Sequence, residues 1–413
     1  MKAGFGREEI RLNLPISHIW SRLEEDGLVR EQLDPLFAHV IAWREKDIKG
    51  TFITLDVLAI PYSFTKEVRR ELKDKGFNSH AISITATHSH TTPTFRWFRG
   101  CPKIKGLREE IKRAILKAIE EAEEDMEEAE LYWGKSECDI NVNRRQIGRV
   151  SEVNDIHAPS GDVDKEVVVL KFKRKKGDIL LINYSAHPIT ITKNPLVVSA
   201  DYPGKLVEYL ERQIKGTRVQ FLQGACGNQN VKIHGDQSTS ELVGKILGEK
   251  VKDALKDLQK ISGSKVKASI ERIKLPLDIQ GTLKDLEREG KKPSHPLMKE
   301  WVEEVKEKVE RKEVPQFREA EVQKISLGEF TIVFLPGEPF MEIGKKIKEM
   351  GAKMVVGYTN IGEAGYIPTQ EAFKEGGYEV DNSYRWYDTW KYSPDVEKVL
   401  LEGVKRVMEV KNG

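Results

Sequence analysis

This chain of 413 residues contains little cysteine, no long apolar run and no large excess of charge of one sign. Its three cysteines, Cys101, Cys138 and Cys226, are widely spaced and odd in number, which excludes a disulfide framework and a Cys-x-x-Cys metal pair. The longest apolar runs, such as residues 179–182, fall far short of the roughly 20 residues that cross a bilayer. Lys and Arg number 68 against 66 Asp and Glu, so the strongly basic balance of many nucleic-acid-binding proteins is absent.

The N-terminal residues contain no apolar segment of the kind found in secretory signals. Together with the scarce cysteine, this predicts a cytoplasmic protein. Charged residues make up 32% of the chain, and this abundance is also typical of proteins from thermophiles. We expect a small-molecule substrate and no nucleic-acid partner, whereas the composition leaves open whether the chain forms a homo-oligomer.

Strands and helices alternate along the chain, which predicts an α/β fold with a mixed β-sheet core covered by helices. No repeat or low-complexity linker divides the sequence, so we expect a single domain over residues 1–413. Residues 281–315 are rich in Lys and Glu, which predicts a charged, solvent-facing helical insertion. The expected strands lie at residues 36–44, 51–59, 81–87, 131–139, 166–174, 179–186, 218–223, 321–327, 329–335 and 353–358, and the expected helices at residues 65–75, 107–128, 204–214, 241–258, 339–350 and 394–410.

The strongest local signal for chemistry is His88-Ser89-His90, which directly follows the expected strand at residues 81–87. Side chains two residues apart point to one side as they leave a strand. The two imidazoles can therefore approach one metal, or one can bind metal while the other transfers a proton. Two ordinary loop histidines are the alternative. The position at a strand end, where open α/β sheets bind ligands, favours a functional pair.

A third histidine and a glutamate also follow apolar strands. His187 ends the expected strand at residues 179–186, and Glu338 follows the apolar residues 331–335. Each has a plainer interpretation, His187 as a buried core histidine and Glu338 as a favourable charge at a helix N-terminus. Two histidines and one glutamate are also a common ligand set of catalytic zinc.

Three tyrosines and two arginines are further candidates. Tyr358, Tyr366 and Tyr378 lie in glycine-rich stretches that suit hydroxyl groups aimed at a site, with ordinary packing as the alternative. Arg144 and Arg145 follow an expected strand, whose end can lie near the same site.

Other residues have competing interpretations as well. Cys226 lies in a small-residue loop and is interpreted as a buried structural thiol rather than a nucleophile, because no basic partner is near in sequence. Asp201 precedes an expected helix and is either its N-cap or a partner of a histidine. An aromatic stretch forms core, a subunit contact or the wall of a substrate pocket, and its members are Tyr384, Trp386, Tyr387 and Trp390.

Taken in order, these motifs resemble the catalytic domain of the neutral/alkaline non-lysosomal ceramidase family. The matching stretches cover most of the chain and lie at residues 3–7, 86–90, 143–144, 183–188, 199–204, 223–230, 335–339 and 357–380.

The resemblance implies a zinc hydrolase of amide bonds. It implies that Zn²⁺ is held by four side chains, His88, His187, Glu338 and Tyr366. It also implies that His90, Arg144 and Tyr378 serve the chemistry, with Arg145 as the alternative to Arg144.

The chain departs from the family pattern in two loops. Residues 91–94 read Thr-Thr-Pro-Thr where the family has Ser-Gly-Pro-Gly, and Asn228 and Asn230 lie in a loop where the family has an aspartate and a serine. We therefore expect a zinc-dependent hydrolase that cleaves an N-acyl amide bond through a metal-activated water, on a substrate that is either lipid-like or smaller and more polar. The alternatives are a metal-dependent hydrolase of an ester or lactam, and a binding protein of this fold that has lost catalysis.

Overall fold

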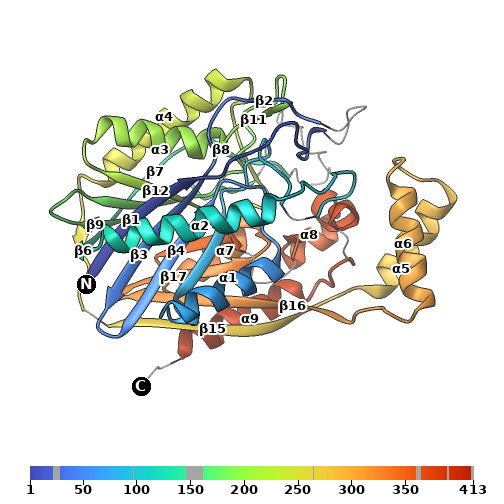
Figure 1. Ribbon diagram of the computed structural model, residues 1–413. Coiled ribbons are helices and arrows are strands. Elements are labelled where there is room, and N and C mark those ends of the chain that lie inside the picture. The colour runs from blue at the N-terminus through green and yellow to red at the C-terminus, as the bar shows by residue number, and fades with distance from the viewer. Residues whose placement is uncertain are drawn as a thin grey trace.

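Two β-sheets that face each other form the centre of the molecule, and helices cover their outer faces (Figure 1). The computed structural model describes residues 1–21, 28–95, 97–145, 161–263, 265–359, 364–387 and 390–410. The arrangement confirms the predicted α/β fold with a mixed sheet core covered by helices.

The larger sheet has nine strands and mixes parallel with antiparallel neighbours. In spatial order its strands are β15 (Val266–Pro276), β16 (Phe317–Leu327), β17 (Phe330–Pro336), β19 (Met354–Thr359), β5 (Ile82–Ala86), β4 (Ile48–Leu55), β3 (Phe37–Glu45), β1 (Lys2–Glu9) and β6 (Glu127–Glu128). The smaller sheet has five strands, which are β12 (Arg218–Gln223), β10 (Ile179–Tyr184), β9 (Glu166–Lys173), β7 (Glu130–Glu137) and β14 (Gln259–Lys260). Short two-stranded pairs are β2 (Glu31–Gln32) with β11 (Val197–Val198), β8 (Asn141–Asn143) with β13 (Gln229–Val231), and β18 (Glu338–Pro339) with β20 (Tyr366–Ile367).

The helices pack on the outer faces of both sheets or extend beyond them. Their bounds are α1 (Tyr62–Asp74), α2 (Leu107–Glu124), α3 (Asp201–Gln213), α4 (Gln237–Ala254), α5 (Ile279–Lys291), α6 (Met298–Glu310), α7 (Met341–Glu349), α8 (Gln370–Glu375) and α9 (Val396–Glu409). Among the described residues, no helix is both long and apolar enough to span a membrane.

Alternation of side chains along the strands divides the core into layers. In β3, Ile41 packs between the two sheets, whereas Val40 packs with α1 and α2 on the outer face. In β9, Leu170 packs between the sheets and Val169 packs with α3 and α4. Successive strand residues point to opposite faces, so strands that are buried on both sides read as continuous apolar runs. This explains why the sequence predicts these strands so clearly.

The structure adds strands that the sequence analysis did not predict. β1 contains two glycines, which have low strand propensity, and β15 alternates apolar with charged residues at the edge of the sheet. The helix expected at residues 107–128 ends at Glu124, because Glu127 and Glu128 pair with β1 as strand β6. The helix expected at 241–258 begins at Gln237, because Asp236 accepts a hydrogen bond from the Ser238 N–H as its N-cap.

α5 and α6 form a helical arm, residues 279–310, between β15 and β16. Figure 1 shows this arm standing beside the main body. Trp301 of the arm is buried, and its ring packs edge-on against Tyr384 with ring centroids 5.9 Å apart. Nη2 of the buried Arg99 donates to Glu304 of the arm at 2.7 Å. The arm is thus attached to the body next to the aromatic stretch at residues 384–390.

The close approach of β1 to α2 generates a stability prediction. A Cβ atom placed on Gly6 would lie 1.9 Å from the carbonyl oxygen of Ala118 in α2, so the helix must move. We expect Gly6→Ala to lower the free energy of unfolding by about 3 kcal/mol, the upper range for overpacking. The control is Gly290→Ala in α5, where a Cβ has only one ordinary contact, 3.9 Å from Val302, and the change should be neutral or slightly stabilising. Denaturant unfolding of both variants measures the difference, and equal stability of the two would contradict the prediction.

Candidate metal centre

The His-x-His pair lies just beyond the C-terminal end of β5. The Thr87 N–H donates to Leu55 O at 2.9 Å and the His88 N–H to Val57 O at 3.1 Å, so the chain stays attached to β4 after the strand ends. His88 has a φ of 67°, which is in the left-handed region and uncommon for a residue with a side chain. The His90 N–H donates to Pro188 O at 3.3 Å. This contact brings the pair next to the end of β10.

His187 follows β10 and forms an isolated parallel bridge with Asn230 of β13. Its backbone N–H donates to Gln229 O at 2.9 Å, and its ring Nδ1 lies 3.0 Å from the same carbonyl. Because a carbonyl oxygen can only accept, Nδ1 carries the proton and Nε2 presents a lone pair. The side chain is fully buried.

Glu338 begins the short strand β18, which pairs in parallel with β20 so that Glu338 lies opposite Tyr366. The preceding Gly337 has a φ of 63°, and a Cβ there would lie 2.3 Å from Gly365 O. Only glycine therefore fits at this position, and its turn brings two distant predicted ligands side by side.

The three imidazoles and the carboxylate converge. Nε2 of His88 and Nε2 of His187 each lie 3.2 Å from Oε2 of Glu338. Candidate ligand nitrogens of His88, His90 and His187 all lie within 4.8 Å of one another. Two atoms bound tetrahedrally to one zinc ion at its usual bond lengths are about 3.3 Å apart, close to the observed separation.

The protonation pattern also fits a cation. Nδ1 of His88 lies 2.6 Å from Leu58 O and therefore donates to it, which leaves Nε2 as a lone pair. That Nε2 is buried without a hydrogen-bond partner among the described residues. Burial lowers the pKa of His187 to about 4, so its imidazole is neutral near pH 7. Two lone pairs facing one carboxylate oxygen repel it unless a cation lies between them, and these residues therefore fit a divalent metal ion.

Glu338 needs a positive charge beside it, because burial by itself raises the pKa of its carboxyl. Protonated imidazoles at His88 and His187 would hold that pKa well below its usual value, and with both Nε2 atoms present as lone pairs a bound cation takes that role. The other carboxylate oxygen, Oε1, accepts a hydrogen bond from the Tyr387 hydroxyl at 2.5 Å. The charge and the orientation of the carboxylate thus both suit metal ligation.

The predicted tyrosines surround this centre. The Tyr366 ring is stacked 6.3 Å from His187, and the Tyr378 ring lies edge-on to Tyr366 at 5.9 Å. Burial raises the pKa of Tyr366 well above its usual value, while the charge of Arg144 and its hydrogen bond act in the opposite direction. Residues 360–363 of the stretch 357–380 lie outside the described part of the chain.

Of the two candidate arginines, Arg144 lies closer to the tyrosines. Its guanidinium is 5.1 Å from the centre of the Tyr366 ring, and its Nε donates to Glu379 Oε1 at 2.8 Å. Arg145 donates to the other oxygen of Glu379 at 2.7 Å and to Gly376 O at 2.8 Å, on the side of α8. Glu379 therefore binds both arginines, one at each carboxylate oxygen, and the sequence analysis did not single it out.

Several competing interpretations are also resolved by contacts. Cys226 is fully buried, and burial raises the pKa of its thiol to about 12, which leaves it protonated and unsuited to nucleophilic attack. The Asp201 carboxylate accepts from Thr190 N at 3.0 Å and Thr190 Oγ1 at 2.6 Å. It therefore holds the segment that follows His187 instead of contacting a histidine.

Two residues around the centre could not be assigned from sequence. Tyr358 packs its ring 4.1 Å from that of His88, and its hydroxyl lies 3.5 Å from His187 Nε2 and 3.0 Å from Cys226 Sγ. Tyr387 belongs to the aromatic stretch, for which the sequence left three interpretations open. Its hydroxyl donates directly to Glu338. Glycine flanks and aromatic clustering marked both as candidates, but their partners are distant in sequence.

Comparison with known proteins gives one family and one fold. A family model described as neutral/alkaline non-lysosomal ceramidase, N-terminal, matches residues 36–244, just over half of the chain. The structure is similar to that of neutral ceramidase from Pseudomonas aeruginosa, with a TM-score of 0.75 and 17% identity over 98% of this chain and 73% of that chain. It is also similar to a ceramidase complexed with C2, with a TM-score of 0.75 and 16% identity over 99% of this chain and 75% of that one. At these identities the structural likeness shows the fold.

The contact between Tyr387 and Glu338 generates a prediction about metal affinity. Tyr387→Phe removes the only hydroxyl that donates to Glu338 Oε1 among the described residues, so the carboxylate is less firmly oriented. We expect the affinity for Zn²⁺ to fall by about 10-fold or more, the usual effect of losing such a partner. Titration against a chromophoric chelator measures it. The matched control is Tyr132→Phe, whose hydroxyl donates to Glu130 at 3.0 Å near an edge of the smaller sheet, and unchanged affinity in both variants would contradict the prediction.

Proposed function

This chain belongs to the neutral/alkaline non-lysosomal ceramidase family, and we propose that it is a zinc-dependent hydrolase that cleaves an N-acyl amide bond. The observation that carries the proposal is the convergence of two imidazole lone pairs on one buried carboxylate, each at 3.2 Å. In this proposal His88, His187, Glu338 and Tyr366 hold the ion. Bound there, Zn²⁺ supplies a Lewis acid that polarises the amide carbonyl and acidifies a water molecule.

His90 is the proposed proton carrier. Its ring lies 5.0 Å from His88 and 5.6 Å from His187, and its buried Nε2 has no hydrogen-bond partner among the described residues. Burial lowers its pKa well below the usual value, so the imidazole is neutral and can accept a proton at Nε2 from the attacking water. Delivery of that proton to the amide nitrogen lets the amine leave. The geometry therefore provides one group for both transfers.

Arg144 and Tyr378 are proposed to stabilise the carbonyl oxygen as negative charge develops on it. Burial opposes ionisation of Arg144, but Tyr366 and Glu379 outweigh it, so the pKa lies well above its usual value and the side chain is a permanent cation. A preoriented donor of this kind is typically worth about 3 kcal/mol of barrier. Asn228 accepts from Met341 N at 2.9 Å at the start of α7 and so has a structural role.

Metal content tests the proposal first. We expect purified protein to contain about one zinc ion per chain, and His187→Ala to lose both the metal and amide hydrolysis, because one of the few ligands is removed. Elemental analysis and release of amine from a panel of N-acyl substrates measure the two effects. His80→Ala is the matched control, since His80 is exposed and distant from the centre. A fully metalled and fully active His187→Ala enzyme would refute the assignment.

A second variant separates proton transfer from metal binding. We expect His90→Ala to keep its zinc while kcat falls by about 10²- to 10⁴-fold, the range for loss of a general acid–base group. Elemental analysis and steady-state kinetics on the same sample measure both. Loss of the metal would instead make His90 a third imidazole ligand, as the mutual distances of the three histidines also permit.

A further inference from the structure

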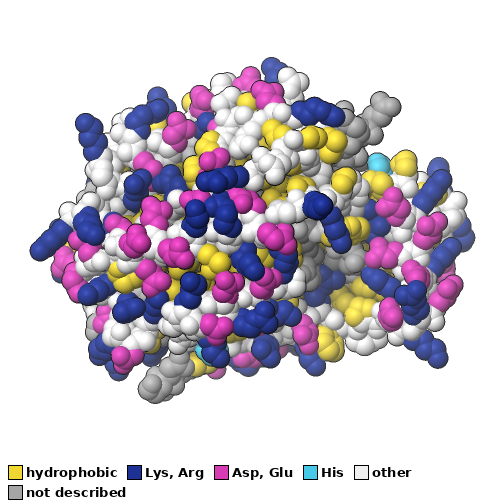
Figure 2. All heavy atoms as spheres, in the orientation of Figure 1, with side chains coloured by type: hydrophobic (Ala, Val, Ile, Leu, Met, Phe, Trp, Pro, Cys, Tyr) yellow, Lys and Arg dark blue, Asp and Glu magenta, His cyan; other side chains and the backbone are white. Residues whose placement is uncertain are grey.

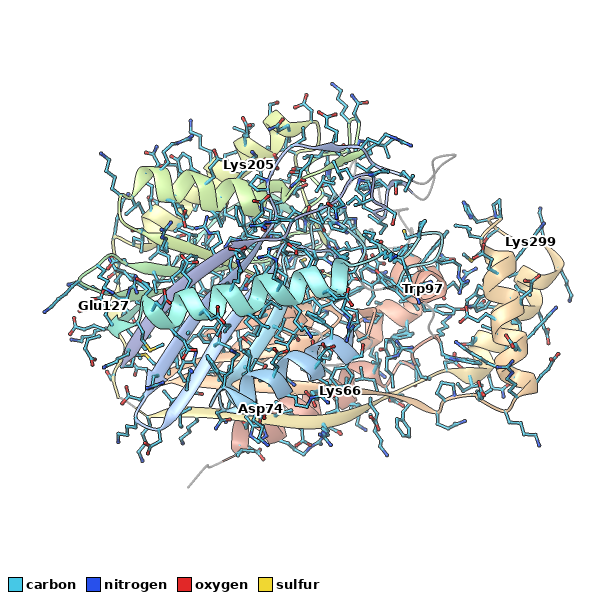
Figure 3. All side chains as sticks on the ribbon, in the orientation of Figure 1. Lys66, Asp74, Trp97, Glu127, Lys205 and Lys299 are labelled. Atoms are coloured by element: carbon cyan, nitrogen blue, oxygen red, sulfur yellow. The ribbon has the colours of Figure 1, made fainter. Side chains whose placement is uncertain are left out.

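A cleft of about 940 Å³ lies between the main body and the helical arm. Its walls come from the loop after the His-x-His pair, the start of α2, the ends of β15 and β16, and the arm. Figure 3 places Trp97 between the body and the arm, and Figure 2 shows the surface hollowed in this region. The volume is that of a site for a small organic ligand.

The cleft reaches the candidate metal centre through Tyr387. The ring of Tyr387 lines the cleft, while its hydroxyl donates to Glu338 at 2.5 Å. Thr94, four residues after His90, lines the same space. A ligand in the cleft therefore lies one side chain away from the carboxylate of the centre.

The walls are largely apolar and partly exposed. Apolar lining residues are Phe95, Trp97, Ile104, Leu107, Leu277 and Phe317. Trp97 is 37% exposed and Phe317 is 38% exposed, and they are two of the few large hydrophobic side chains on the described surface. Apolar surface of this kind next to a site is typical of a groove that a ligand covers.

Three cations from separate elements face the same space. Lys103 is exposed and forms no ion pair with a described residue, and Arg318 is in β16. Arg108 is in the first turn of α2 and pairs with Glu67, which does not line the cleft, at 2.5 Å. Glu304 is the single carboxylate among the described lining residues, and it is already bound by Arg99 at 2.7 Å and by Lys308 at 2.9 Å. The described lining residues thus carry a net positive charge, which attracts an anionic ligand and gives a neutral lipid no advantage.

We infer that this cleft binds an anionic N-acyl substrate, with the acyl chain on Trp97 and Phe317 and an acidic group near Lys103, Arg108 and Arg318. The inference rests on the proposed function for its scissile bond, but the binding itself does not depend on turnover. An N-acyl amino acid has this chemistry, whereas an uncharged N-acyl lipid does not.

A matched pair of ligands tests the inference. N-decanoylglycine and N-decanoylglycinamide have the same chain and nearly the same size, and only the first is an anion. Binding is measured by calorimetry on the full-length protein with metal removed by a chelator, so that neither compound is hydrolysed. We expect the anion to bind about 5- to 10-fold more tightly, and this advantage to shrink at high salt.

Variants assign the effect to the cleft. Lys103→Ala combined with Arg318→Ala should abolish the preference for the anion, whereas Lys105→Ala, exposed and only two residues from Lys103, should keep it. Trp97→Ala should weaken the binding of both ligands by a similar factor, because it removes apolar surface that both acyl chains contact. Equal binding of the two ligands to the wild type, or an equal loss in the Lys105 control, overturns the inference.

Turnover separates this inference from the proposed function. If the zinc-loaded protein hydrolyses neither compound while the charge-dependent binding persists, the proposed hydrolase activity is wrong and the cleft assignment is supported. Hydrolysis of both compounds with no preference for the anion supports the activity and overturns the cleft assignment.

Discussion

The site depends on a buried carboxylate that two imidazole lone pairs approach at the same oxygen. Glu338 is almost fully buried, its Oε2 lies 3.2 Å from Nε2 of both His88 and His187, and its Oε1 accepts a hydrogen bond from the Tyr387 hydroxyl. Because both Nδ1 atoms donate to backbone carbonyls, the histidines cannot turn their N–H groups towards the carboxylate without losing those bonds. A cation between them satisfies all three groups at once, and the surrounding backbone is arranged to present them.

The segment at residues 378–387 connects this centre to the rest of the molecule. Glu379 binds Arg144, and Tyr387 binds Glu338. On its other side the same segment contacts the helical arm, where the Tyr384 hydroxyl donates to Asp285 at 2.6 Å and Arg385 donates to Glu289 at 2.5 Å. The arm thus supports the segment that orients the carboxylate and also forms one wall of the cleft.

The comparisons with known structures establish the fold, whereas the side chains that line the cleft decide its chemistry. At 16% and 17% identity, the overall fold is shared over nearly the whole chain. Fold alone does not specify substrate, since function depends on the side chains placed on it. The charged and apolar side chains that line the cleft lie on loops and strand ends, and they include Lys103, Arg318, Trp97 and Phe317. Loops and strand ends tolerate substitution better than the packed core does.

Local sequence patterns were sufficient to predict the α/β class and most elements. The strands that precede His88, His187 and Glu338 are short apolar runs, so the positions of these residues at strand ends follow from periodicity. The resemblance to a family supplied Tyr366 and the roles of the remaining residues, which the spacing did not contain. β1 and the short strands β18 and β20 were missed because glycines and two-residue pairs carry little local signal.

The sequence by itself therefore determined the element types and which chemically capable residues follow buried strands, because side-chain periodicity is a local property. Only the tertiary structure decided that Glu338 lies opposite Tyr366, that Tyr387 contacts the carboxylate, and that the helical arm completes a basic, apolar cleft. Those contacts join residues that are tens to hundreds of positions apart. They depend on strand order, pairing register and helix packing, which the hydrophobic pattern of any one segment does not encode.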